Sequence, residues 1–121
     1  MTVLTEGKRA ADFIVSEANG TRSRDVVTIA QGAALEPGTV LGKVTASGKY
    51  VALDPAANTG AETAVGLLRA RADAAIADVS AVAILRDGEV NGAELVWPAG
   101  ITPEQKAAAI ADLAAHGIIV R

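Results

Sequence analysis

Residues 36–55 read Glu-Pro-Gly-Thr-Val-Leu-Gly-Lys-Val-Thr-Ala-Ser-Gly-Lys-Tyr-Val-Ala-Leu-Asp-Pro, and this stretch decides the fold. It opens with a Pro-Gly turn, because proline presets φ and glycine tolerates positive φ. The β-branched residues of 39–45 predict a strand, and 49–53 predict its partner after a short Ala-Ser-Gly connection. Pro55 ends the second strand, since proline lacks the N–H that a sheet ladder needs. The stretch therefore predicts an antiparallel hairpin.

A two-stranded hairpin is marginal by itself, so other elements must cover it. We expect further strands at 26–29, 65–72, 79–86, 93–97 and 118–120. Segment 65–72 also has the composition of a helix, but Arg69 and Arg71 alternate with apolar neighbours at period two, which favours a strand. Segment 79–86 is the most apolar run in the chain and predicts a buried strand.

The clearest helix signal lies near the C-terminus. Thr102 is a suitable N-cap, Pro103 suits the first helical position and Gln105 completes a capping box. Gly117 stands where a left-handed C-terminal cap belongs. Four residues at helical spacing predict the buried face: Ala107, Ile110, Leu113 and Ala114. These segments together predict a mainly β (α+β) fold with one C-terminal helix.

Length and composition favour one small domain that gains from association. The chain has 121 residues, and half of them are apolar, but its aromatic residues are only Phe13, Tyr50 and Trp97. The core must therefore be built from Val, Ile, Leu and Ala. Such a core often gains by burying more surface in an oligomer, which we expect here. Trp97, directly before Pro98, is assigned to the core or to a subunit interface.

Several classes of partner and chemistry are not expected. The chain has no cysteine, which excludes disulfides and thiolate chemistry. Its net charge of −3 argues against a general nucleic-acid binder. No apolar run approaches the ~20 residues of a membrane span, so no membrane partner is expected. The N-terminal residues carry no pattern of a secretion signal.

The first 25 residues differ from the rest. Their basic and acidic residues balance, and one short apolar run, 10–15, precedes a turn-rich stretch with an Asn-Gly signal. Such a segment cannot offset the entropy of ordering itself. We interpret 1–25 as an N-terminal arm that needs a partner, and 26–121 as the β-rich domain. The alternative is an edge strand on the chain's own domain.

A search for reactive groups yields no catalytic, cofactor-binding or metal-binding residue. His116, the single histidine, is better placed to interact with the carbonyl end of the helix than to catalyse. Asp87 and Glu89 fit a solvated turn, and Asp54 fits a strand stop. Gly38, Gly42 and Gly48 belong to the hairpin, and the sequence contains no phosphate-binding loop motif. We therefore expect no enzyme, no cofactor and no small-molecule substrate.

Three runs of sequence carry a family resemblance. They are Ala18-Asn19-Gly20-Thr21-Arg22-Ser23-Arg24, Gly38-Thr39-Val40-Leu41-Gly42-Lys43-Val44 and Val90-Asn91-Gly92-Ala93-Glu94-Leu95-Val96-Trp97-Pro98. In this order, with the following helix and final Ile-Ile-Val strand, they resemble the head decoration proteins of tailed bacteriophages. This is the family of the phage lambda capsid-stabilising protein. The resemblance covers about residues 6–121.

The resemblance implies a virion protein of β-clip-like fold that is made in the host cytoplasm. It implies a homotrimer on the outer surface of the expanded head, where it clamps neighbouring subunits of the major capsid (coat) protein through an N-terminal arm. We assign the coat contact to the apolar residues Phe13, Ile14 and Val15, which can present an extended edge. Arg22 and Arg24 are added as a clamp for an acidic surface, with solvated arm charges as the alternative.

Two other classes remain open at this point. A trimeric β-clip nucleotide hydrolase would need an acidic cluster for Mg²⁺ and a glycine-rich nucleotide loop, and the sequence shows neither. A non-viral adaptor or carbohydrate-binding module would need surface aromatic residues, of which this chain has almost none. Nucleotide turnover and affinity for empty heads separate the three hypotheses.

Overall fold

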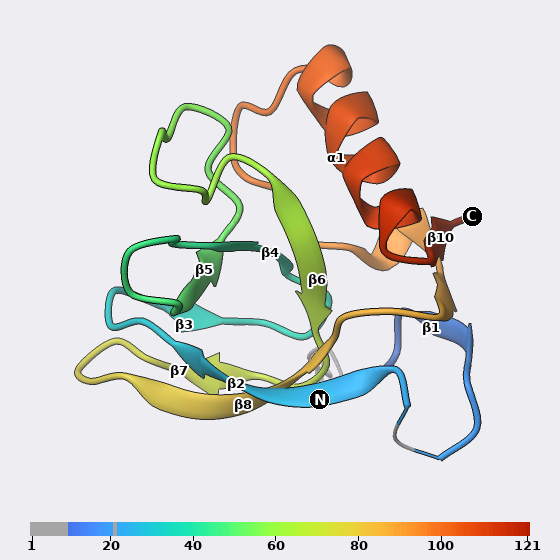
Figure 1. Cartoon of the computed structure of the whole chain (residues 1–121), viewed down its shortest axis with the longest axis horizontal. Helices are drawn as coiled ribbons and strands as arrows, with labels where there is room; N and C mark the ends of the chain where they lie inside the picture. Colours follow the sequence, from blue (N-terminus) through green and yellow to red (C-terminus); the bar gives the residue numbers. More distant parts are fainter. Residues whose placement is uncertain (1–9, 21) are drawn as a thin grey trace, which may run out of the picture.

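The computed structural model describes residues 10–20 and 22–121. These residues form ten strands, one 3-10 helix and one α-helix (Figure 1). In chain order they are β1 (Ile14–Glu17), β2 (Arg24–Ile29), β3 (Ala34–Leu35), β4 (Val40–Lys43), β5 (Tyr50–Ala52), β6 (Ala64–Leu68), β7 (Ala72–Asp73), β8 (Val79–Ile84), β9 (Gly88–Val90), η1 (Gly92–Glu94), α1 (Pro103–Ala115) and β10 (Ile118–Val120). The expected mainly β fold with one C-terminal helix is confirmed.

The predicted hairpin is present and forms part of a closed five-stranded barrel. β4 and β5 pair antiparallel, with Leu41 opposite Ala52 and Lys43 opposite Tyr50. The barrel order is β2-β5-β4-β6-β8, and the antiparallel pair of β8 with β2 closes it. Closure leaves no unpaired strand edge in this sheet. The other barrel strands thereby supply the partners that an isolated hairpin lacks.

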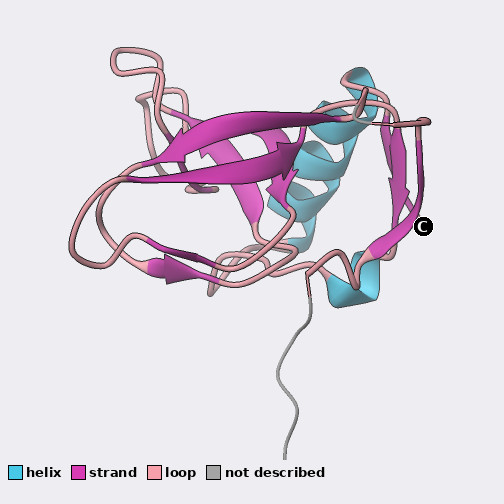
Figure 2. Ribbon diagram, turned by 90° about the horizontal axis from the view of Figure 1, so that it is seen from below, coloured by secondary structure: helices cyan, strands magenta, loops and turns pink. Residues whose placement is uncertain are grey.

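A second sheet stands beside the barrel and holds the two ends of the described chain together. Its order is β1-β9-β10, with β1 antiparallel and β10 parallel to β9. Helix α1 packs against β6 on one side and β10 on the other. Figure 2 shows the helix behind the barrel strands and the C-terminal strand at the far side of the helix. β3 and β7 form a separate two-stranded sheet.

The buried apolar residues form two clusters. One fills the barrel: Val27, Ile29, Leu41, Leu68, Ala72, Ala74 and Ala83. The other lies between the barrel, α1 and the second sheet: Phe13, Val40, Leu53, Ala64, Leu67, Ile84, Val90, Leu95, Ala109, Leu113 and Ile118. Except for Phe13, every member is aliphatic, as the composition predicts. The second cluster draws on residues from Phe13 to Ile118, so it joins the first described residues to the last.

The helix begins as its sequence predicts. The Thr102 hydroxyl accepts from the Gln105 backbone N–H at 3.1 Å, and the Gln105 side chain accepts from the Thr102 N–H at 3.0 Å. Its buried face differs from the expected one. Ala109 and Leu113 are buried, whereas Ala107 and Ala114 are exposed. Ile110 is half-buried. Alanine is compatible with any face of a helix, so only Ile110 and Leu113 of the four predicted residues were informative.

Three strand predictions need correction. Segment 65–72 is divided into β6 and β7, with 69–71 between them. In segment 79–86 the strand ends at Ile84. Only Ala83 and Ile84 of this strand are buried, because one face of β8 lies on the outside of the barrel. Segment 93–97 is not a strand. Asn91 caps η1 by accepting from the Ala93 N–H at 3.0 Å, so an Asx turn replaces extended backbone there.

Candidate functional site

The apolar residues assigned to the coat contact have three different environments. The Phe13 side chain is 1% exposed and belongs to the second core cluster. Ile14 is half-buried against the same cluster. Val15 is 59% exposed. Ile14–Glu17 is β1, an edge strand of the chain's own sheet, which is the alternative that the sequence left open. Their binding of coat protein stays a prediction, and Phe13 is not on the surface.

Phe13 packs against the Pro37-Gly38 turn that precedes β4. Gly38 has a φ of +86°, and a Cβ built there would lie 3.4 Å from the Phe13 ring. The Phe13 carbonyl accepts from the Asn91 N–H at 2.8 Å. The segment that enters the domain at Phe13 is therefore packed between the Pro-Gly turn and the strand that precedes η1. The part of the expected arm formed by residues 1–9 lies outside the described residues.

Glu17 and Arg24 form an ion pair that joins β1 to the start of β2. Their side chains are 16% and 28% exposed. The Ser23 side chain, which is fully buried, also donates to the Glu17 carboxylate at 2.8 Å. The hydrogen bond from Arg24 holds the pKa of Glu17 below its ordinary value, assisted by Ser23 and opposed by partial burial. No local pattern marks Ser23 as a partner of Glu17, because its role depends on a tertiary contact.

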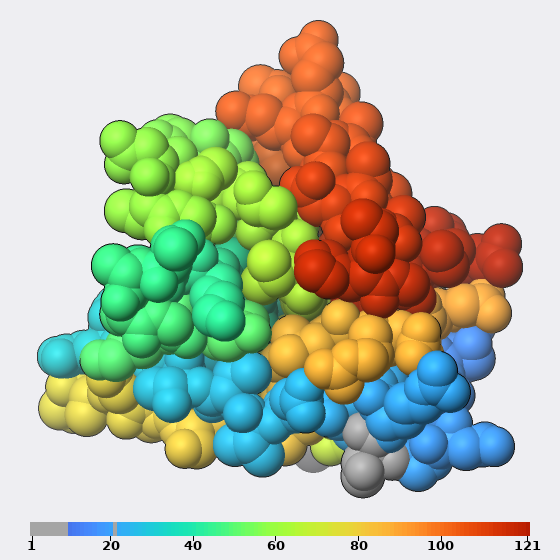
Figure 3. All heavy atoms as spheres, viewed as in Figure 1, coloured from blue at the N-terminus to red at the C-terminus, as the bar shows by residue number. Residues whose placement is uncertain are grey.

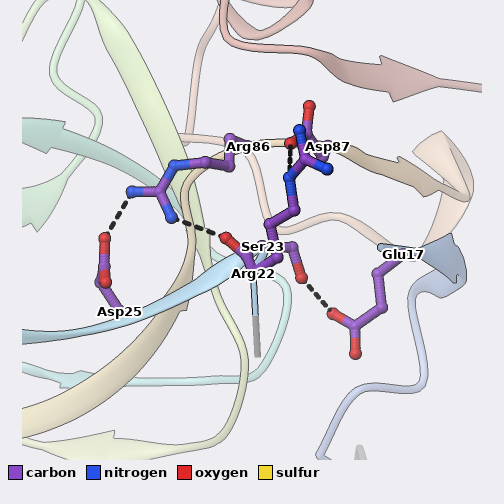
Figure 4. A network of polar contacts seen from close by, with 6 residues as sticks. All are labelled: Glu17, Arg22, Ser23, Asp25, Arg86 and Asp87. Atoms are coloured by element: carbon purple, nitrogen blue, oxygen red, sulfur yellow. Dashed lines mark hydrogen bonds and ion pairs between the residues drawn. The ribbon is translucent and has the colours of Figure 1, made fainter. Parts of the chain in front are cut away.

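Arg22 takes part in a second set of contacts, between the segment before β2 and the turn after β8 (Figure 4). Its Nε lies 3.1 Å from the Asp87 carboxylate. Arg86 reaches back to the same segment, donating to the Arg22 carbonyl at 2.7 Å and to the Asp25 carboxylate. Arg22 and Arg24 are thus both paired within the chain. Residues 17–20 and 22–25 are joined to the domain by these contacts, and in Figure 3 they lie along the lower edge beneath the orange residues that follow β8.

The described residues offer little to a catalytic or metal site. They contain no group of three or more His, Cys, Asp or Glu residues that could hold a metal ion. A hollow of about 410 Å³ surrounds β5 and the adjacent loops, and Asp54 is the one titratable side chain in its lining. The Asp54 carboxylate accepts from the Ala56 N–H at 3.1 Å, as a strand stop would. No helix in the described part of the chain is long and apolar enough to cross a membrane.

The chain was compared with models of known protein families. The model of the family described as bacteriophage lambda head decoration protein D matches residues 3–118. The chain belongs to the head decoration protein family. The match covers nearly the whole chain, including the barrel, α1 and the second sheet as far as the first residue of β10. A search of curated proteins returned no match.

Family membership gives this head decoration protein a role on the capsid of the phage virion. The family consists of structural proteins, and the groups considered for chemistry have structural partners here. Asp87 binds Arg22, and Glu89 binds Arg121 at 2.8 Å. The hydrogen bond from Arg121 lowers the pKa of Glu89. His116 is the C-cap of α1, and its backbone N–H donates to the Leu113 carbonyl.

Trp97 of the head decoration protein lies far along the chain from the arm but packs against the same core cluster as Phe13. The Lys106 Nζ is 5.2 Å from the centre of its ring. The indole Nε1–H is buried and has no hydrogen-bond partner among the described residues. Trp97 also borders a hollow of about 160 Å³ with Leu35, Leu53 and Pro98. Its role at a trimer interface stays a proposal.

Proposed function

We propose that this protein binds the expanded phage head as a homotrimer and stabilises the head by clamping neighbouring coat subunits. It is made in the host cytoplasm and sits on the outer surface of the capsid, and its small domain is of the β-clip-like kind. The family match over residues 3–118 carries this proposal. The closed barrel supports it by giving a rigid body on which binding elements can be held.

The N-terminal segment 1–25 is the proposed coat-binding arm. Within its described part, β1 is an edge of the second sheet, paired on one side with β9. An exposed strand edge can accept another strand, with main-chain hydrogen bonds giving affinity and alternate side chains giving specificity. Val15 is the exposed apolar side chain on that edge. A coat strand added there would contact Val15, while Phe13 anchors the edge from inside the core.

Threefold symmetry would multiply a weak contact. Three identical binding elements on one rigid trimer raise the effective concentration at the second and third sites, so weak single contacts give tight attachment. We assign Trp97 and the hollow beside it to the trimer contact or to the core that supports it. A trimer that binds only the expanded shell stabilises that state by linkage.

Co-sedimentation of the purified protein with unexpanded and expanded empty heads of the phage or prophage that encodes it tests this function. We expect binding to expanded heads alone, saturating at a multiple of three copies. A variant lacking residues 1–9 keeps every residue of the two core clusters. It should therefore fold, yet bind heads more weakly. Absence of binding of the full chain to either head form would contradict the proposal and favour an adaptor function.

A further inference from the structure

The outer face of β2 and β8 carries an apolar surface. Val26 and Val82 are opposite each other in the antiparallel ladder, and Val26 is 73% exposed. The next position across the barrel is Arg69, which follows β6 and whose backbone N–H donates to the Val82 carbonyl at 3.0 Å. These three side chains, with Arg24 and Asp25, line a hollow of about 350 Å³. We call the surface formed by these five residues the β2–β8 surface.

The charges that line the β2–β8 surface do not cancel. Its lining holds two arginines, Arg24 and Arg69, and one carboxylate, Asp25, which leaves one positive charge. Arg24 pairs with Glu17, and Arg86 pairs with Asp25. Arg69 donates no hydrogen bond to the Glu17 or Asp25 carboxylate, although its charge helps to lower the pKa of Glu17. Its Nε is buried and has no hydrogen-bond partner among the described residues.

A guanidinium whose Nε lacks a hydrogen-bond partner, beside an exposed valine, fits one kind of ligand group. A carboxylate supplies the missing charge and can take two parallel N–H···O bonds from a guanidinium. A small apolar side chain next to it would cover Val26. A single exposed valine is common on protein surfaces and does not indicate a binding site. Here the valine pair, the hollow and the excess positive charge occur in one place.

The position of the β2–β8 surface suggests whose carboxylate it binds. The Arg69 carbonyl accepts from the Ala11 N–H at 2.9 Å, so the surface adjoins the N-terminal segment proposed to contact the coat. Arg24 belongs to both. We propose that the β2–β8 surface binds an acidic and apolar segment of the coat protein, with Arg69 pairing its carboxylate and Val26 contacting its apolar side chain. This inference rests on the proposed function.

The test compares two variants with two matched controls in the head co-sedimentation assay. Arg69→Gln removes the charge, and Val26→Ser removes the apolar contact. Arg71→Gln and Ile76→Ser make the same changes outside the surface, at an arginine paired with Glu36 and at an isoleucine that is 87% exposed. We expect each surface variant to bind expanded heads about tenfold more weakly or worse, because every trimer carries three copies of the change. The controls should bind like the unsubstituted protein.

Salt dependence separates a charge contact from a merely structural role. Affinity of the unsubstituted protein should fall as salt rises, and Arg69→Gln should flatten that fall, whereas Val26→Ser should leave its slope unchanged. Surface variants that bind heads as well as the controls would overturn the inference while leaving the proposed function intact. Loss of trimer mass in Val26→Ser would also overturn it, by placing the surface between copies. Failure of the unsubstituted protein to bind heads would contradict the proposed function and the inference together.

Discussion

The ring of Phe13 lies against the backbone of Gly38, and the two residues come from the N-terminal segment and the turn that opens the β4–β5 hairpin. A Cβ at Gly38 would meet the Phe13 Cδ1 at 3.4 Å and the Glu94 carbonyl at 2.9 Å. A side chain at Gly38 would thus collide with the Glu94 carbonyl, and Phe13 packs at ordinary contact distance beside it. This contact turns a segment that reads as a detachable arm into part of the core.

Phe13→Ala should destabilise the domain by about 3–5 kcal/mol, because it empties a fully buried ring site. Val15→Ala is the control, since Val15 lies only two residues further along the chain, in β1, but is 59% exposed. That change should alter the free energy of unfolding by less than about 0.5 kcal/mol. Denaturant unfolding measures both. Equal, small effects would show that Phe13 does not belong to the core.

Gly38→Ala should cost more stability than Gly48→Ala. Both glycines have positive φ, +86° and +70°, so each substitution pays a similar backbone strain of about 1–2 kcal/mol. A Cβ at Gly48 meets nothing within 4 Å, whereas one at Gly38 meets Glu94 and Phe13. The difference between the two variants in free energy of unfolding therefore isolates the close contact. Indistinguishable variants would argue against the close approach of the Glu94 carbonyl to this turn.

Glu17→Gln should remove a stabilisation that depends on pH. The pKa of Glu17 is below its ordinary value of 4.5, chiefly through the hydrogen bond from Arg24. A carboxyl whose pKa is lower in the folded state stabilises fully above its unfolded pKa and loses that contribution as the pH falls through the folded value. The stability difference between wild type and variant should be largest near neutral pH and shrink below about pH 4.

Unfolding by denaturant at several pH values measures this effect. Glu36→Gln is the control, because Glu36 and Arg71 form a pair about half exposed, and such pairs contribute little at any pH. A difference for Glu17→Gln that stays constant between neutral and acidic pH would contradict the assigned role of the Glu17–Arg24 pair.

Trp97→Ala should lower the melting temperature or dissociate the trimer, since it removes a large ring packed against the core and beneath Lys106. We expect a loss of about 3 kcal/mol. Trp97→Phe keeps a ring and removes the buried N–H that lacks a partner. It should therefore be much milder. Calorimetry and light scattering report both properties. A Trp97→Ala protein with unchanged melting temperature and mass would refute a role in either core or trimer.

Local signals in the sequence were sufficient for the hairpin and for the start of the helix. The Pro-Gly turn and the β-branched run predict β4 and β5, and the Thr102–Gln105 capping box forms as its residues indicate. These features depend on neighbours within a few residues. The family resemblance supplied the role on the capsid, which residue chemistry alone did not reach.

What the sequence could not predict depends on contacts between distant segments. The burial of Phe13 needs Gly38 and Asn91, and the strand β9 lies in a stretch that reads as two turns, because Gly88–Val90 is extended only between β1 and β10. The pairing of Arg22 with Asp87 likewise joins residues far apart in the chain. The composition of 1–25 predicts an arm that needs a partner, whereas Arg22 and Arg24 pair with carboxylates of the same chain.

The central claim is that the protein stabilises the expanded head by binding it. The most direct measurement is the melting temperature of expanded empty heads with increasing amounts of the protein. A ligand that binds one state stabilises it by RT ln(1 + [L]/Kd), about 2.7 kcal/mol at a hundredfold excess over Kd. We predict a melting temperature that rises with protein concentration until sites at a multiple of three copies are filled. Heads that melt at the same temperature when fully decorated would contradict the account.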